Sequence, residues 1–263
     1  ELNEYLKSLD GRIEEIKIKG KPSVFDTIYY SPFGIIANHS EISAKNNEAW
    51  AYRWTGQDDN LVSIAILEMA KANNWKDFKA GVKKFDAPHL NWAYADAQGN
   101  IGMYVAGTYL LRQGDEGLFL RDGTKNVNIW QNYIPSEHAI QEFNPKRGFV
   151  SSANQYPVDK TYPYVINAFN FPSYRARRIN QVLRADSTIT IEDMKNLQLD
   201  NYVMTASDNL DFFLSVIDYN ELDDEEKLVY KALSEWNLKA DPELQAPAYF
   251  MRWEYDIWQL AWD

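Results

Sequence analysis

Hydrophobic and polar residues alternate along much of the first half of the chain, with the period of two that is typical of half-buried strands. The alternation runs through residues 11–37, where Gly20 and Pro22 interrupt it, so it predicts two strands joined by a turn. A further short strand is predicted at 48–56. The clearest hairpin is predicted at 89–107, because two alternating runs flank the turn string DAQGN. These patterns indicate antiparallel sheet.

The spacing of apolar residues becomes helical in two places. After the short strand, residues 60–72 and 75–85 predict a pair of helices. Beyond Pro172 helical spacing dominates, and the predicted helices are 173–183, 190–199, 205–217, 222–236 and 246–260. Ahead of these helices, residues 112–147 are rich in Gly, Asp, Asn and Pro and predict a long loop with short strands. The layout is α+β, with an antiparallel sheet packed against helices.

The composition and net charge of the chain exclude several classes of function. Apolar residues make up 45% of the chain and aromatic residues 14%, which indicates a globular protein with a sizeable core. The net charge of −11 argues against nucleic acid as a partner, because an acidic surface repels phosphate. No apolar run approaches the roughly 20 residues of a membrane span, so no membrane partner is expected. With no Cys and three scattered His, the sequence shows no disulfide, thiolate nucleophile or metal-ligand spacing.

A last strand is predicted at 148–153, in the string GFVSSANQYP, and it ends at Asn154. An Asn at a strand end most often bonds to the backbone of its own turn. Turn chemistry alone therefore predicts a structural role for this side chain.

Eight strings of the chain occur in the order, and close to the spacings, of one enzyme family. They are AYRWTG, NNWKDFKAGVKKFDAPHLNWAYADAQGNIGMYVAG, YIP, FNPKRGFVSSANQ, YPY, SYRARRINQVL, TIEDMKNLQLD and LSEWN. From about Ile13 to Trp236, the chain resembles the penicillin acylase family of N-terminal nucleophile hydrolases. The resemblance implies part of a four-layer α/β/β/α sandwich of antiparallel sheets and helices. We expect the sheet-rich part of this core, with the helix pair inserted, at 1–172 and a helical region at 173–263.

The resemblance also implies the chemistry of a linear-amide hydrolase. The family uses the free α-amino group of a Ser as the base for that same Ser, because a neutral hydroxyl is a poor nucleophile. The side-chain amide of an Asn in the SAN position then donates to the oxyanion, and an Arg about twenty residues later supports that Asn. Carried over to this chain, the two catalytic residues are Asn154 and Arg175. The neighbouring Arg177 and Arg178 are interpreted as structural or surface charges.

The nucleophile implied by this resemblance has no counterpart in the sequence. Glu1 carries no hydroxyl, and the internal Ser residues lack the free amine. We therefore expect an internal piece of a large subunit that is inactive alone. Its expected partners are the small subunit and the N-terminal part of the large subunit from the same precursor, together with a small-molecule N-acyl amide such as a β-lactam side chain or an acyl-homoserine lactone. The family expectation for localisation is the periplasm or secretion.

No cofactor or metal is expected in this piece, although the resemblance allows calcium in the complete protein. The position near YPYVIN that often carries a ligand Asp in the family is Ile166 or Asn167 here. An apolar Ile side chain offers no oxygen to calcium, which takes oxygen ligands.

Other interpretations of the sequence stay open. The acidic residues at 58–59, 115–116 and 223–226 could indicate acid/base chemistry, but their places beside helix starts and in polar loops favour capping and solvated charges. His89 has no visible partner and is interpreted as a structural residue. The aromatic and acidic composition also fits a non-catalytic extracellular or periplasmic module that binds carbohydrate or peptide. A third alternative is a scaffold derived from an acylase.

Overall fold

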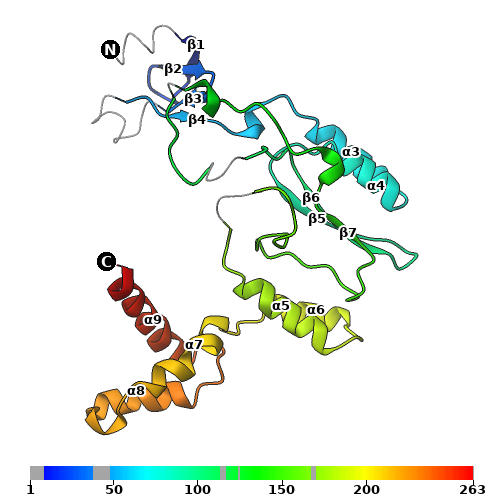
Figure 1. Ribbon diagram of the computed structural model, residues 1–263. Coiled ribbons are helices and arrows are strands. Elements are labelled where there is room, and N and C mark those ends of the chain that lie inside the picture. Colours follow the sequence, from blue (N-terminus) through cyan, green and yellow to red (C-terminus); the bar gives the residue numbers. More distant parts are fainter. Residues whose placement is uncertain (1–8, 38–47, 113–116, 124, 167–169, 263) are drawn as a thin grey trace. The chain divides into compact units, whose positions relative to one another are not determined.

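The computed structural model describes residues 9–37, 48–112, 117–123, 125–166 and 170–262. The chain forms two compact units (Figure 1). The first unit comprises Glu1–Asn144 and Pro157–Phe169, and the second comprises Pro145–Tyr156 and Asn170–Asp263. Each unit has its own sheet or helices and its own buried core, so each is described by itself.

The first sheet of the first unit is antiparallel, with the strand order β1-β2-β3-β4. Its strands are β1 Asp10–Ile16, β2 Val24–Ser31, β3 Gly34–Ile36 and β4 Ala51–Tyr52. The hairpin predicted at 11–37 is confirmed, and Ile13 pairs with Thr27 in its register. The strand predicted at 48–56 is shorter than expected, because the 3-10 helix η1 already begins at Thr55.

The second sheet, of order β5-β6-β7, carries the core of the first unit. Its strands are β5 Leu90–Ala95, β6 Ile101–Ala106 and β7 Gln141–Phe143, and the helices α3 Val62–Lys71 and α4 Trp75–Val82 complete the cluster. Phe78, Val82 and Phe85 pack there with Tyr104 and Ala106. The hairpin at 89–107 and the helix pair are therefore both confirmed.

The second unit is helical, and all five helices predicted beyond Pro172 form. They are α5 Tyr174–Ala185, α6 Ile191–Gln198, α7 Met204–Ser215, α8 Asp224–Ser234 and α9 Ala246–Trp262 (Figure 1). Side-chain caps define two of the starts, since Thr190 and Asp223 each form a capping box with the acid three residues later. The core of this unit joins α7, α8 and α9 through Leu210, Leu233 and Phe250.

The strand predicted at 148–153 is wrong. This segment is not part of any β-ladder among the described residues, although β7 ends only a few positions earlier in the sequence. Gly148 instead closes a turn, because its N–H donates to the Pro145 carbonyl at 2.9 Å and its φ is 76°. An alternating pattern predicts a strand only where a neighbour supplies the ladder hydrogen bonds. The sequence pattern contained no information about that neighbour.

Candidate active site

Asn154 lies in the second unit, at the end of the segment 148–153 and directly after the buried Ala153. Its backbone is in the left-handed region, with φ of 65°. Asn tolerates this region better than most residues, because its short polar side chain fits there. The N–H of Ala153 donates to the side-chain oxygen of Gln155 at 2.8 Å, so Gln155 and not Asn154 satisfies the local backbone. The Asn154 side chain is exposed and remains available for a different partner.

That partner is Arg175, the second residue of α5. Its Nη2 donates to Oδ1 of Asn154 at 3.0 Å, and its guanidinium lies 5.9 Å from the ring centroid of Phe171. A guanidinium has only donors, so the amide oxygen must be the atom that faces it. The Asn154 Nδ2 then points its two N–H groups elsewhere, and neither has a protein partner in the described part of the chain. The structure thus brings the two residues predicted as catalytic into direct contact.

A second polar contact joins the same two segments. Asn180 of α5 donates from Nδ2 to the Ser151 hydroxyl at 3.3 Å and to the Ala176 carbonyl at 2.7 Å. Ala176 itself is buried, which fixes the first turn of α5 against the unit. No sequence signal pointed to Asn180, because an Asn inside a helix pattern is unremarkable. Ser151 and Asn154 each accept a hydrogen bond from a side chain of α5, so this segment is attached to the helix at two points.

The other two arginines of the string RARR anchor α5 elsewhere. Arg177 pairs with Asp208 of α7 through two hydrogen bonds, and Arg178 pairs with Asp200 through two at 2.9 and 2.7 Å. The hydrogen bonds from the arginines are the main cause that lowers the pKa of Asp208 and of Asp200 below the usual carboxyl value. Their interpretation as structural charges is confirmed. Arg175 differs from both, since none of the ion pairs among the described residues supplies it with a carboxylate.

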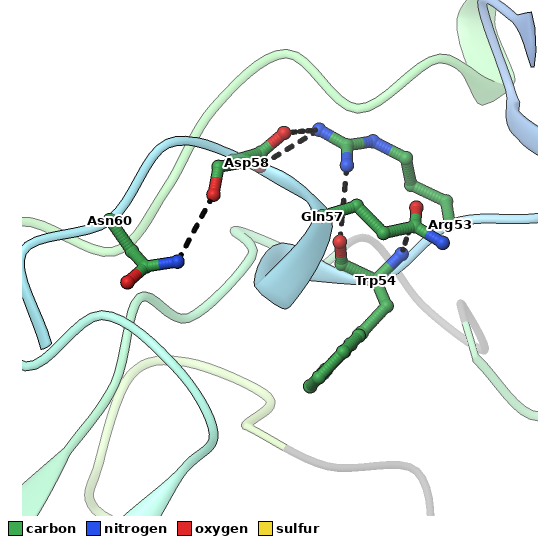
Figure 2. Close-up of polar contacts among 5 residues, drawn as sticks. All are labelled: Arg53, Trp54, Gln57, Asp58 and Asn60. Carbon is green, nitrogen blue, oxygen red and sulfur yellow. Dashed lines mark hydrogen bonds and ion pairs between the residues drawn. The ribbon is translucent and has the colours of Figure 1, made fainter. Parts of the chain in front are cut away.

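The end of the string AYRWTG and the residues that follow it form a hydrogen-bonded turn in the first unit, shown in Figure 2. Arg53 donates from Nη2 to both carboxylate oxygens of Asp58, at 2.7 and 2.9 Å, and from Nη1 to the Trp54 carbonyl. Gln57 accepts from the Trp54 N–H, and Asn60 donates to the Asp58 carbonyl. Asp58 is therefore the partner of an arginine rather than a free acid or base.

The remaining candidates also have structural partners. His89 lies within hydrogen-bond distance of the Thr108 carbonyl, at 3.0 Å from Nε2, and stacks on Tyr109. Asp223 caps α8 by accepting from the Glu226 N–H at 2.8 Å. The acidic pair at 115–116 lies outside the described residues. The structural interpretation of His89 and of the run at 223–226 is confirmed.

A calcium site is not formed by the described side chains alone. They include no group of three or more His, Cys, Asp or Glu residues that could hold a metal ion. The carbonyl of Ile166 accepts from Nε of Arg112 at 3.2 Å, and a cationic donor at that oxygen is a poor neighbour for a cation. Asn167 lies outside the described residues. The same residues also contain no helix that is both long and apolar enough for a membrane span.

A family model described as penicillin amidase matches residues 3–263, and so extends over the second unit and both of its predicted catalytic residues. The chain belongs to the penicillin amidase family. Among related proteins, a penicillin G acylase of Escherichia coli is 28% identical over 174 residues, which is 66% of this chain and 20% of that protein. An acyl-homoserine lactone acylase of Pseudomonas syringae pv. tomato is 26% identical over 170 residues, or 64% of this chain and 20% of that protein.

A solved structure supports the fold. A thermostable penicillin G acylase from Alcaligenes faecalis superposes with a TM-score of 0.69 and 19% identity, over 88% of this chain and 42% of that chain. At this identity the likeness shows the fold, which is that of an N-terminal nucleophile hydrolase. The predicted fold class is thus confirmed, whereas the division at 172 stays a prediction. This member of the penicillin amidase family spans about a fifth of the length of the curated relatives that it matches.

Proposed function

We propose that this chain is part of an amidase that hydrolyses the linear amide bond of N-acyl compounds. In this role Asn154 donates to the oxyanion and Arg175 holds Asn154 in place. The observation that carries the proposal is the 3.0 Å hydrogen bond from Arg175 to the amide oxygen of Asn154, in a chain of the penicillin amidase family. The relatives named as penicillin G acylase and acyl-homoserine lactone acylase support a substrate with an N-acyl group.

The chemistry of amide hydrolysis explains why this pair suits the task. Attack on an amide carbonyl moves negative charge onto its oxygen, and donors already aimed at that oxygen lower the barrier. With Oδ1 engaged by Arg175, the amide group of Asn154 cannot rotate freely, and its N–H groups face away from the guanidinium. The positive charge on the oxygen side also makes those N–H groups stronger donors, because hydrogen bonds in a chain polarise one another. Asn154 itself stays neutral and avoids the cost of burying a charge under a substrate.

The proposal requires other polypeptide to supply the nucleophile. We propose a Ser with a free α-amino group, contributed by the remaining segments of the same precursor, and export to the periplasm or beyond as the setting. The chain by itself is then expected to give no turnover. Calcium in the complete protein stays a prediction.

The test is amide hydrolysis by the chain assembled with the nucleophile-bearing segments, using phenylacetyl, glutaryl and long-chain acyl anilides as probes. Asn154→Ala should lower kcat about 10² to 10³-fold, because that is the usual effect of losing one oxyanion donor. Asn220→Ala, which changes an exposed Asn outside the site, is the control and should leave kcat unchanged. Unchanged kcat in Asn154→Ala would remove the oxyanion role, and turnover by the chain alone would contradict the requirement for a second segment.

A further inference from the structure

A cavity of about 180 Å³ lies in the first unit. Its walls come from the end of α4, from β6 and the residues after it, and from the segments 134–140 and 162–166. Asn154 and Arg175 belong to the second unit and do not line it. Val82, Ile134 and Ile140 give the cavity apolar walls, and three of its polar lining residues, Tyr104, Tyr109 and Lys83, carry hydrogen-bond donors.

Tyr104 is the most informative of these donors. Only 3% of this residue is exposed, and its ring packs in the core with Val82 and Phe85. Burial is the main cause that raises the pKa of Tyr104 to about 12, so its hydroxyl stays protonated and can donate. That hydroxyl has no hydrogen-bond partner among the described residues. The hydroxyl is not one of the fully buried unpartnered polar atoms of the described residues, which are Thr55 Oγ1 and Trp92 Nε1, so it reaches open space and can donate to a ligand there.

Two further donors line the same cavity. The ring of Tyr109 stacks on His89 with centroids 4.2 Å apart, which holds it in place, and burial raises the pKa of its hydroxyl. Lys83, at the C-cap position of α4, is an exposed residue that also lines the cavity. Within the described residues, neither the Tyr109 hydroxyl nor the Lys83 ammonium has a hydrogen-bond partner. Three side chains that can donate, and that have no hydrogen-bond partner among the described residues, therefore line the cavity.

Asp86 is the carboxylate that lines the cavity. It accepts one hydrogen bond at each carboxylate oxygen, from the Thr108 hydroxyl at 3.0 Å and the Leu61 N–H at 3.2 Å. A carboxylate has about four lone-pair sites, so Asp86 can still accept from a ligand hydroxyl.

The charges around the cavity decide between an anionic and a neutral ligand. Glu137 is close enough to add to the effect of burial in raising the pKa of Tyr104. The pKa of Glu137 is itself lowered, mainly by the hydrogen bond from its own N–H and in smaller part by the charge of Lys83. Two carboxylates, Asp86 and Glu137, thus lie near one ammonium group. The net negative charge of these three groups disfavours a bound anion relative to a neutral ligand.

We propose that this cavity binds a small neutral polyhydroxyl compound, between a triol and a pentose in size. Each hydroxyl of such a compound can accept from Tyr104, Tyr109 or Lys83 and donate to Asp86, while its C–H groups contact the apolar walls. The cavity volume of about 180 Å³ is large enough for a ligand of that scale. This site is independent of the amide hydrolysis proposed above.

The experiment is a titration of the full chain with glycerol and with xylose, followed by saturation-transfer and amide-shift NMR. Xylose is expected to bind in the millimolar range, with shifts at the residues that line the cavity. Tyr104→Phe removes only the hydroxyl and keeps the ring in the core, and we expect it to weaken binding roughly three- to tenfold, the usual value of one hydrogen bond. Tyr52→Phe is the matched control, because Tyr52 is 66% exposed on β4 and does not line the cavity.

Three outcomes would overturn the proposal. The first is that the folded wild-type chain binds neither polyol, so that water alone fills the cavity. The second is that Tyr104→Phe and Tyr109→Phe both bind xylose as the wild type does. The third is that isobutyrate, an anion of similar size, binds more tightly than xylose and shifts the same residues. Amide spectra of each variant establish that it is folded before the affinities are compared.

Discussion

At Asn154 the backbone and the proposed chemistry require the same residue type. A φ of 65° favours Asn or Gly, while donation to an oxyanion requires a neutral N–H donor on a short side chain. Asn meets both requirements, but Gly meets only the first. The Asn at position 154 is therefore required for its backbone conformation, for its chemistry or for both. Substitutions can separate these two requirements.

The variants Asn154→Gly and Asn154→Ala separate the conformational requirement from the chemical one. Both remove the amide, so we expect both to lose turnover equally in the assembled enzyme. Only Asn154→Ala strains the left-handed backbone, so it should lower the free energy of unfolding of the chain by about 1–2 kcal/mol relative to Asn154→Gly. Urea denaturation of the chain measures this difference. Equal stability of the two variants would show that the segment relaxes out of the left-handed region without cost.

At the scale of single elements, the helices were easier to predict than the strand before Asn154. Helical spacing and caps are local, so residues within a few positions of each other determine them, as the capping boxes of Thr190 and Asp223 show. The strand predicted at 148–153 depended on a neighbour that local pattern does not specify. Asn154 and Arg175 were identified by their place in the family motifs, whereas Asn180 and Phe171 became visible only when folding brought them beside that pair.

The attachment of α5 makes stability depend on pH. The hydrogen bond from Arg178 is the main cause that lowers the pKa of Asp200 in the folded chain. A lowered folded pKa means that the pair stabilises the fold above the ordinary carboxyl pKa of about 4, and that this stabilisation is lost as the pH falls through the lowered value. At pH 7, Asp200→Asn should therefore lower the free energy of unfolding, by about 1 kcal/mol or less because the pair is partly solvated.

The measurement for Asp200→Asn is urea denaturation at a series of pH values. Its difference from the wild type should narrow as the pH falls below about 4, because the wild-type carboxylate then becomes protonated. Asp211→Asn is the control, since Asp211 is exposed on α7 and makes no ion pair among the described residues. A difference that stays constant across the series would mean that Asp200 acts through packing and not through charge.

At the scale of the whole chain, the buried cores of the two units coexist with large apolar side chains that remain exposed. On β1 and β2, Ile13 is 69% exposed and Phe25 is 66% exposed, and in the pleat they share one face. On α9, Phe250 is fully buried while Trp258 and Trp262 are 59% and 77% exposed. Contiguous exposed apolar surface is uncommon on a monomeric soluble protein and usually marks a contact surface. The sheet of β1 and β2 and the end of α9 each carry apolar side chains of this kind.

These exposed residues should bind a hydrophobic dye without stabilising the fold. Trp258→Gln combined with Trp262→Gln should lower the fluorescence of a bound naphthalene sulfonate dye, and should change the free energy of unfolding by no more than about 0.5 kcal/mol, as exposed substitutions usually do. Phe250→Ala on the same helix should instead cost about 3–5 kcal/mol, because it empties a packed core position. If the double variant loses stability to the same extent as Phe250→Ala, the two Trp side chains are core residues in solution. If its dye signal matches the wild type, the end of α9 is not a surface that attracts apolar ligands.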